Sequence, residues 1–157
     1  MRILTQALSI ALISQLVTYQ VVAQAEQQVV NSIQSHWNML NSGNVAGFVT
    51  NFVADGFSAA SSEGSLWEYE RQSTEEAIEQ TKGVKFDFHP HHISVIMLGK
   101  DMALATYYLV GSITPSEGEG ITNYRTRASQ IWVKDGSGWK IKHEHFSALF
   151  GGAGIGG

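Results

Sequence analysis

Four segments in the second half of the chain alternate apolar and polar side chains and are rich in β-branched and aromatic residues. They cover residues 92–98, 102–113, 123–133 and 139–147. Glycine-containing turn sequences at residues 99–101 and 135–138 separate two pairs of them, and an acidic loop at residues 115–120 separates the middle pair. Because period-two alternation with short turns is typical of hairpins, this half of the chain predicts an antiparallel meander.

The first half of the chain has the spacing of helices. Val29, Ile33, Trp37 and Leu40 recur three or four residues apart, which predicts an amphipathic helix over residues 26–40. Residues 45–53 predict a second helix, residues 57–60 a short strand, and residues 73–82 a third helix that begins at Ser73. Helices followed by a meander indicate an α+β domain, with N-terminal helices packed on a curved antiparallel sheet.

The first 25 residues have the pattern of a secretory signal peptide. Arg2 gives a positive start, residues 3–22 are mostly apolar and lack charge, and residues 23–25 form an Ala-x-Ala cleavage sequence. A membrane anchor is the alternative, since about 20 residues can span a bilayer. The polar side chains within the segment and the cleavage sequence favour removal. We therefore expect an exported chain, periplasmic or secreted, that begins at Glu26 and is not stably inserted in a membrane.

The remaining chain is expected to form one domain over residues 26–150, followed by a flexible glycine-rich tail at residues 151–157. The chain has no cysteine, which excludes disulfides and thiolate metal sites. Its formal net charge is −4, and no cluster of Lys or Arg occurs. This charge pattern argues against nucleic acid and anionic membranes as partners.

Three stretches carry a family resemblance: NSGNVAGF (residues 41–48), PHHISVIMLGKDMALATYYL (residues 90–109) and SQIWVKDGSGWKIKHEHFSAL (residues 129–149). They resemble the nuclear transport factor 2-like superfamily, above all its SnoaL-like branch and the association domain of calcium/calmodulin-dependent kinase II. The resemblance implies a cone-shaped, ketosteroid isomerase-like fold that encloses a pocket, and sheets that pair into homodimers or larger rings. The superfamily includes isomerases, cyclases, dehydratases and binding domains, so the fold implies no single function.

The last strand contains two histidines around a glutamate. Alternation places Trp139, Ile141, His143, His145 and Ser147 on one face and Lys140, Lys142, Glu144 and Phe146 on the other. The two histidines could bind a metal with help from the histidines at 89, 91 and 92, or they could hydrogen-bond across strands or at a subunit interface. Imidazole sites need further ligands that the sequence does not place, so we expect no metal and no other cofactor.

The resemblance also implies which face lines the pocket. Pocket-lining arginines of the kinase association domain fall at the positions of Leu109, Gln130 and Phe146, none of which is arginine here. Glu144 and Phe146 then face the pocket, and an outer, dimer-forming face is expected to carry Arg127, His143 and His145. The expected pocket lining is mainly apolar and aromatic, as small-molecule sites usually are: Tyr107, Leu109, Gln130, Trp132, Lys142 and Phe146.

Glu144 is the candidate catalytic residue. A carboxylate in an apolar pocket has a raised pKa and can transfer protons. The alternatives are a salt bridge with Lys142 or Arg127, or exposure near the end of the sheet. Asp87 with His89 could line the pocket mouth, and Trp67 with Tyr69 could cap it, although packing is the more ordinary role of such residues.

Three functions follow from these expectations. The first is an exported domain whose pocket binds a small molecule and which self-associates through its sheet. The second is a pocket enzyme of the isomerase, cyclase or dehydratase type that uses Glu144 as acid or base. The third is an oligomeric assembly module with a vestigial pocket.

Overall fold

The computed structural model describes residues 2–62, 68–70, 73–136 and 138–149, with side chains from residue 20 onward except those of Glu68 and Glu70. Its elements, in chain order, are α1 (Arg2–Asn41), α2 (Val45–Val49), β1 (Phe57–Ala60), β2 (Glu68–Glu70), α3 (Thr74–Gln80), β3 (Lys85–Gly99), β4 (Met102–Thr114), β5 (Ile121–Asp135) and β6 (Gly138–Ala148). The strands form one sheet in the order β2-β1-β6-β5-β4-β3. The predicted α+β class, with helices preceding the meander, is confirmed.

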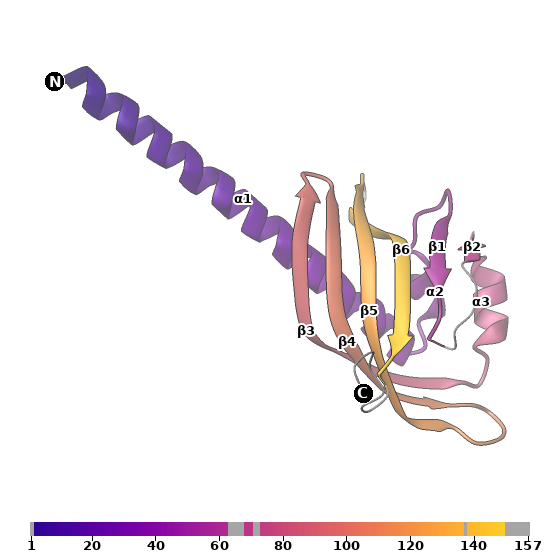
Figure 1. Ribbon diagram of the computed structural model, residues 1–157. Helices are drawn as coiled ribbons and strands as arrows, with labels where there is room; N and C mark the ends of the chain where they lie inside the picture. The colour runs from indigo at the N-terminus through magenta and orange to yellow at the C-terminus, as the bar shows by residue number, and fades with distance from the viewer. Residues whose placement is uncertain (1, 63–67, 71–72, 137, 150–157) are drawn as a thin grey trace.

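The sheet combines an antiparallel meander with one parallel pairing. Strands β3 to β6 pair with their sequence neighbours in antiparallel register, whereas β1 runs parallel to β6 and antiparallel to β2. The sheet is therefore mixed, and not antiparallel throughout as the sequence predicted. Figure 1 shows the long strands β3, β4 and β5 curving around the helices, with α1 crossing behind β3 and β4. We call the face that α1 covers the inner face and the opposite one the outer face.

Helix α1 is held to the sheet by the residues that its spacing predicted. Val29, Ile33, Trp37 and Leu40 are all buried in the main hydrophobic core. Among the residues of α1 whose side chains are described, Ala25 is the first that packs against the core, and it is partly buried. Val29, Ile33, Trp37 and Leu40 all lie after the expected cleavage site, and cleavage after Ala25 stays a prediction. Among the residues whose side chains are described, no helix is long and apolar enough to cross a membrane.

The C-terminal end of α1 is tied to β3 by a side-chain amide. Asn41 Nδ2 donates to the carbonyl oxygen of Phe88 at 2.8 Å, and Asn41 Oδ1 accepts from the backbone nitrogen of Phe88 at 2.8 Å. A glycine brings β3 and β4 close together at the same level, because a Cβ at Gly111 would lie 1.8 Å from the carbonyl oxygen of Asp87. These two residues fix where the helix and the hairpin meet.

A bulge in β6 changes which side chains face the core. His143 pairs with Ile131, but the next β5 residue, Trp132, pairs with Ile141, so Lys142 is an extra residue without a cross-strand partner position. As a result Trp139 and Ile141 are buried in the core, although Glu144 and Phe146 of the opposite parity also face inward. The predicted alternation is therefore wrong for the residues before the bulge. Trp139 and Ile141 face the core, and Lys142, which was predicted to line the pocket, does not lie on the inner face.

Candidate functional site

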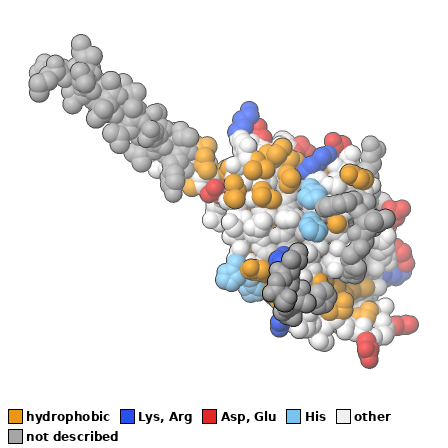
Figure 2. Space-filling model, viewed as in Figure 1, with side chains coloured by type: hydrophobic (Ala, Val, Ile, Leu, Met, Phe, Trp, Pro, Cys, Tyr) orange, Lys and Arg blue, Asp and Glu red, His pale blue; other side chains and the backbone are white. Residues whose placement is uncertain are grey.

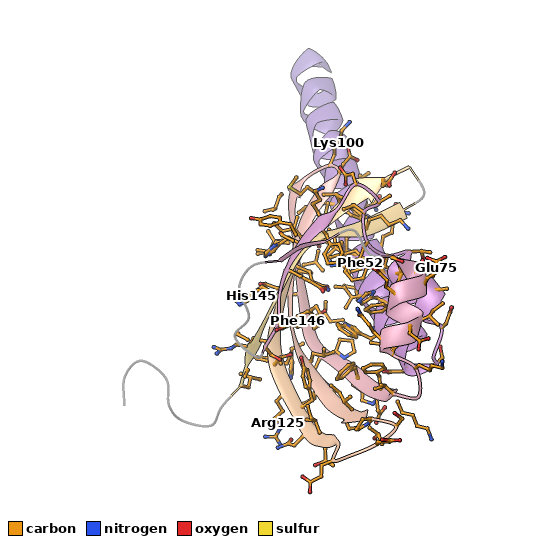
Figure 3. The ribbon with its side chains drawn as sticks, turned by 90° about the vertical axis from the view of Figure 1, so that its right-hand side faces the viewer. Phe52, Glu75, Lys100, Arg125, His145 and Phe146 are labelled. Atoms are coloured by element: carbon orange, nitrogen blue, oxygen red, sulfur yellow. The ribbon has the colours of Figure 1, made fainter. Side chains whose placement is uncertain are left out.

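The inner face of the sheet collects most of the residues that the sequence assigned to a pocket. Tyr107, Leu109, Gln130 and Trp132 are all buried there, and Glu144 and Phe146 are half-buried. Figure 3 shows Phe52 between the sheet and the helices, while His145 and Arg125 project from the opposite side. The structure brings these predicted residues together but separates Lys142 from them.

A chain of side-chain hydrogen bonds runs across β5 and β6. Trp132 Nε1 donates to Gln130 Oε1 at 3.1 Å, and Gln130 Nε2 donates to Glu144 Oε2 at 3.1 Å. Gln130 lies directly opposite Glu144 in the strand register and is fully buried. Because Gln130 uses its oxygen on the indole, its amide nitrogen is oriented toward the carboxylate. The sequence-based alternatives of a Glu144 salt bridge with Lys142 or Arg127 do not occur among the described contacts.

Tyr107 places a phenol beside this carboxylate. Its hydroxyl oxygen accepts a hydrogen bond from Trp37 Nε1 at 3.0 Å. Burial raises the pKa of Tyr107 well above its usual value, the negative charge of Glu144 raises it further, and the hydrogen bond from Trp37 opposes the shift. The hydroxyl is therefore protonated at neutral pH and remains able to donate a hydrogen bond.

Aromatic rings surround these polar groups. Trp37 lies 6.0 Å from Phe146 and 5.5 Å from Phe88 between ring centroids, and Phe88 lies 5.0 Å from Tyr124. The fully buried end of the cluster is at Trp132, whereas Glu144 and Phe146 keep partial contact with their surroundings. A half-buried carboxylate at the edge of an aromatic core has lost part of its contact with water, which costs free energy unless hydrogen bonds replace it.

His36 is a buried polar residue of α1. It is fully buried, its ring stacks on Phe48 at a centroid distance of 4.1 Å, and Trp132 lies edge-on at 6.3 Å. Neither ring nitrogen has a hydrogen-bond partner among the described residues. Burial lowers the pKa of His36 to about 3, so the ring is neutral near pH 7. Its place in the heptad of apolar residues was the only sequence signal.

Lys142 and His143 lie at a hollow on the outer face. Lys142 Nζ pairs with Asp55 Oδ1 at 3.0 Å and donates to the carbonyl oxygen of Gly56 at 2.8 Å. His143 Nδ1 shares a hydrogen bond of 2.7 Å with Ser58 Oγ. Partial burial, followed by repulsion from His145, lowers the pKa of His143. This hollow has a volume of about 550 Å³ and also includes Tyr69, which the sequence had placed over the pocket.

The other candidate residues lie apart from the interior cluster. Arg127 and His145 are on the outer face with His143, the face that the resemblance implied for them, and their role at an interface stays a prediction. Asp87 and His89 are exposed and form an ion pair of 2.8 Å. Trp67 and residues 151–157 lie outside the described residues. Within the described part of the chain, no three His, Asp or Glu side chains converge as a metal site requires.

The interior arrangement has the elements of recognition and of proton transfer. Glu144 supplies a carboxylate that accepts hydrogen bonds or protons. Tyr107 supplies a neutral hydroxyl donor whose pKa is raised by the charge of Glu144. Both are held by second residues, Gln130 and Trp37, which limit their movement. A molecule with an apolar body and one polar group fits this combination.

Comparisons with known proteins agree with the fold. The sequence model of the SnoaL-like domain matches residues 29–151. No curated protein sequence matches the chain closely enough to count as a relative. A solved structure of a proposed dehydratase of the NTF2-like family from Streptomyces avermitilis has a TM-score of 0.67 and 16% sequence identity, and the match covers 82% of this chain and 98% of that one.

Two further solved structures have similar overlap. An NTF2-like protein of unknown function from Pseudomonas putida KT2440 has a TM-score of 0.63 and 21% identity, over 82% of this chain and 89% of that one. A proposed calcium/calmodulin-dependent protein kinase II association domain from Xanthomonas campestris has a TM-score of 0.62 and 18% identity, over 79% and 87%. At these identities the likeness establishes the fold and leaves ligand and activity open.

Proposed function

The chain belongs to the SnoaL-like domain family, and we propose that it binds a small, largely apolar molecule on the inner face of its sheet, with Glu144 and Tyr107 as the polar contacts. The observation that carries the proposal is the half-buried carboxylate of Glu144, which Gln130 holds at the edge of an aromatic core. Burial of a carboxylate costs free energy unless it gains hydrogen bonds. A ligand that donates to Glu144 would supply one.

The ligand chemistry follows from the two groups. Glu144 prefers a hydroxyl, amine or amide N–H donor, whereas the Tyr107 hydroxyl offers a proton to a carbonyl or ether oxygen. The rings of Phe88, Tyr124 and Phe146 favour an aromatic or alicyclic body. Phenols and hydroxyketones have this combination of groups.

Replacement of Glu144 by glutamine is expected to weaken binding of a phenolic probe such as 2-naphthol about 10-fold, because a hydrogen bond to a charged acceptor is lost. The measurement is a titration followed by chemical-shift changes of backbone amides around Gln130 and Glu144. Glu75→Gln, which removes an exposed carboxylate of α3, is the matched control (Figure 3). Equal affinities of the Glu144→Gln variant and the wild type would contradict the proposal.

An enzyme of the isomerase, cyclase or dehydratase type is the second candidate. The observation in its favour is the electrostatic coupling of Glu144 to Tyr107, because proton abstraction needs a base and a neutral donor for the developing charge. The same Glu144→Gln variant separates the two functions. A catalyst would lose turnover of a bound hydroxyketone while it keeps its fold, whereas a binding protein has no turnover to lose.

We also propose that the outer face joins two copies of the chain. Ile96, Leu104 and Ile131 form one row across β3, β4 and β5, and Met102 with Val133 forms the next. Ile96 is 57% exposed and Met102 is 44% exposed. Figure 2 shows hydrophobic side chains gathered on the upper part of this face. An exposed apolar patch of this kind is typical of protein–protein contacts, and a second copy offers the same complementary patch.

Ile96→Lys is expected to convert a dimer into a monomer, because two copies of the charged side chain would be buried near each other. Sedimentation velocity of the wild type and the variant at equal concentration measures this. Ile78→Lys on α3 is the matched control, since Ile78 is 48% exposed but lies outside the patch. A wild-type chain that sediments as a monomer would remove the self-association proposal.

A further inference from the structure

On the outer face of the sheet, next to the apolar row of Ile96, Leu104 and Ile131, lie two rows of side chains that can donate hydrogen bonds. In the first of them Thr106, Ser129 and His145 are cross-strand neighbours on β4, β5 and β6. In the next, Tyr108, Arg127 and Ser147 are neighbours on the same strands. Alternation along the strands keeps both rows on the face away from α1. The register of β4, β5 and β6 thus places an arginine, a histidine and four hydroxyl-bearing side chains side by side.

These side chains line a hollow of about 460 Å³ that also includes His92. Volumes of this order are typical of small-molecule sites. No aspartate or glutamate is among the described residues that line it. In a chain with a formal charge of −4, this is a local surface of cationic and donor groups.

Arg127 has no acidic partner among the described residues. By contrast, three lysines form ion pairs. The distances from Nζ to a carboxylate oxygen are 3.4 Å for Lys82, 3.5 Å for Lys100 and 3.0 Å for Lys142. Arg127 is exposed at the hollow, and no carboxylate of the described residues forms an ion pair with its guanidinium. A guanidinium presents two parallel N–H donors that match a carboxylate or a phosphate, and this geometry suits an oxyanion better than a lysine would.

The backbone of β3 is distorted where it meets this hollow. The pairing of β3 with β4 shifts between His91 and Ser94, and His92 has a φ of 52°, in the left-handed region that non-glycine residues rarely adopt. The bulge adds His92 to the outer face, where its ring lies 6.1 Å from that of Tyr108 in an edge-on arrangement. A strained residue that is maintained at the rim of a pocket is a common feature of binding sites.

We propose that this hollow binds a small organic anion, whose carboxylate or phosphate is held by Arg127 with His92, His145 and the hydroxyls of Thr106, Ser129 and Ser147. The Tyr108 ring provides an apolar wall for the body of the ligand. This site lies on the opposite face of the sheet from Glu144, so it is independent of the interior binding proposed above. It lies next to the apolar rows that contain Ile96 and Leu104, on the same face that is proposed above to join two copies of the chain.

Calorimetric titration of the full chain with benzoate, phenyl phosphate and inorganic phosphate, in a low-salt buffer without other oxyanions, tests the proposal. We expect saturable binding of at least one of them. Arg127→Gln should weaken it at least about 10-fold, and Arg127→Lys should weaken it less, because the lysine keeps the charge but loses the paired donors. Preference for benzoate would assign a carboxylate ligand, and preference for the two phosphates would assign a phosphate.

Arg125→Gln is the matched control, because Arg125 is exposed on the same strand and face but pairs with Val110, one row beyond the hollow. Its affinity should stay within about twofold of the wild type, since an exposed charge outside the site contributes little. Glu144→Gln should also leave anion binding unchanged, which separates this site from the interior one. Absence of saturation by about 10 mM for all three probes, or equal losses for Arg125→Gln and Arg127→Gln, would overturn the proposal.

Discussion

Replacement of His36 by phenylalanine is expected to make the stability of this domain less sensitive to acid. The folded-state pKa of His36 is about 3, against an ordinary value of 6.5 for an unfolded chain. Below pH 6.5 the unfolded state therefore takes up a proton that the folded state excludes, and the free energy of unfolding falls by about 1.4 kcal/mol per pH unit until about pH 3. At pH 4.5 the wild type loses about 3 kcal/mol through this residue alone.

Urea unfolding of the wild type and His36→Phe at pH 7.5 and pH 4.5 measures the effect. A phenylalanine keeps the stack on Phe48 and removes two ring nitrogens that have no partner among the described residues, so stability at pH 7.5 should not fall. His91→Phe is the control, because His91 is exposed and lacks the burial on which the argument rests. If His36→Phe lost as much stability on acidification as the wild type, the buried histidine would not be the cause.

The sequence predicted the elements that depend on local pattern. The spacing of Val29, Ile33 and Trp37 located the packed part of α1, and the N-cap Ser73 marked the start of α3, where its side chain accepts from the backbone nitrogen of Glu76. The turn at residues 99–101 separated β3 from β4 within one residue of the observed bounds. The parallel pairing of β1 with β6 was missed because it joins residues more than 80 positions apart, such as Ser58 and His143.

Bulges explain where the site prediction was wrong. The resemblance implied that Tyr107, Gln130 and Glu144 share one face, and Glu144 lies beyond the bulge in β6, opposite Gln130. The extra residue in β6 is Lys142, so the lysine predicted to line the pocket instead pairs with Asp55 on the other face. A one-residue register change moves side chains between faces, and nothing in the alternating sequence of β6 marks the position of the extra residue.

The degree to which each inner-face side chain is buried could not be predicted from the sequence either. Trp132 and Leu109 were predicted to line a pocket, and they lie on the predicted face but are fully buried. Glu144 and Phe146, on the same face, are only half-buried. An inner-face position therefore identifies a candidate, but the position of α1 across the sheet decides which of these side chains are fully buried in the core.

Replacement of Gln130 by glutamate is expected to destabilise the fold at neutral pH. The loss of stability should grow as the pH rises, whereas the loss caused by His36 grows as the pH falls. The new carboxylate would face Glu144 at the position where the Gln130 amide now donates over 3.1 Å, in a fully buried place. Two carboxylates this close share one proton, so the pair keeps that proton in the folded state above the ordinary pKa of a glutamate. Relative to the wild type, stability should be nearly retained near pH 4 and lost as pH rises.

The expected loss at pH 7.5 is about 3 kcal/mol, since each unit by which the folded-state pKa exceeds the unfolded value of about 4.3 costs about 1.4 kcal/mol once the pH is above both. Urea unfolding at pH 5 and pH 7.5, always as the difference from the wild type at the same pH, removes the shared contribution of His36. Gln130→Leu is the comparison variant, because it breaks the same two hydrogen bonds without adding charge and should cost about 2 kcal/mol at both pH values. A pH-dependent loss of unfolding free energy in Gln130→Glu, but not in Gln130→Leu, would show that the Glu144 carboxylate lies in a low-dielectric interior. Both proposed functions, binding and proton transfer, depend on that property of Glu144. A loss that did not change with pH would place Glu144 in water and remove the basis of either function.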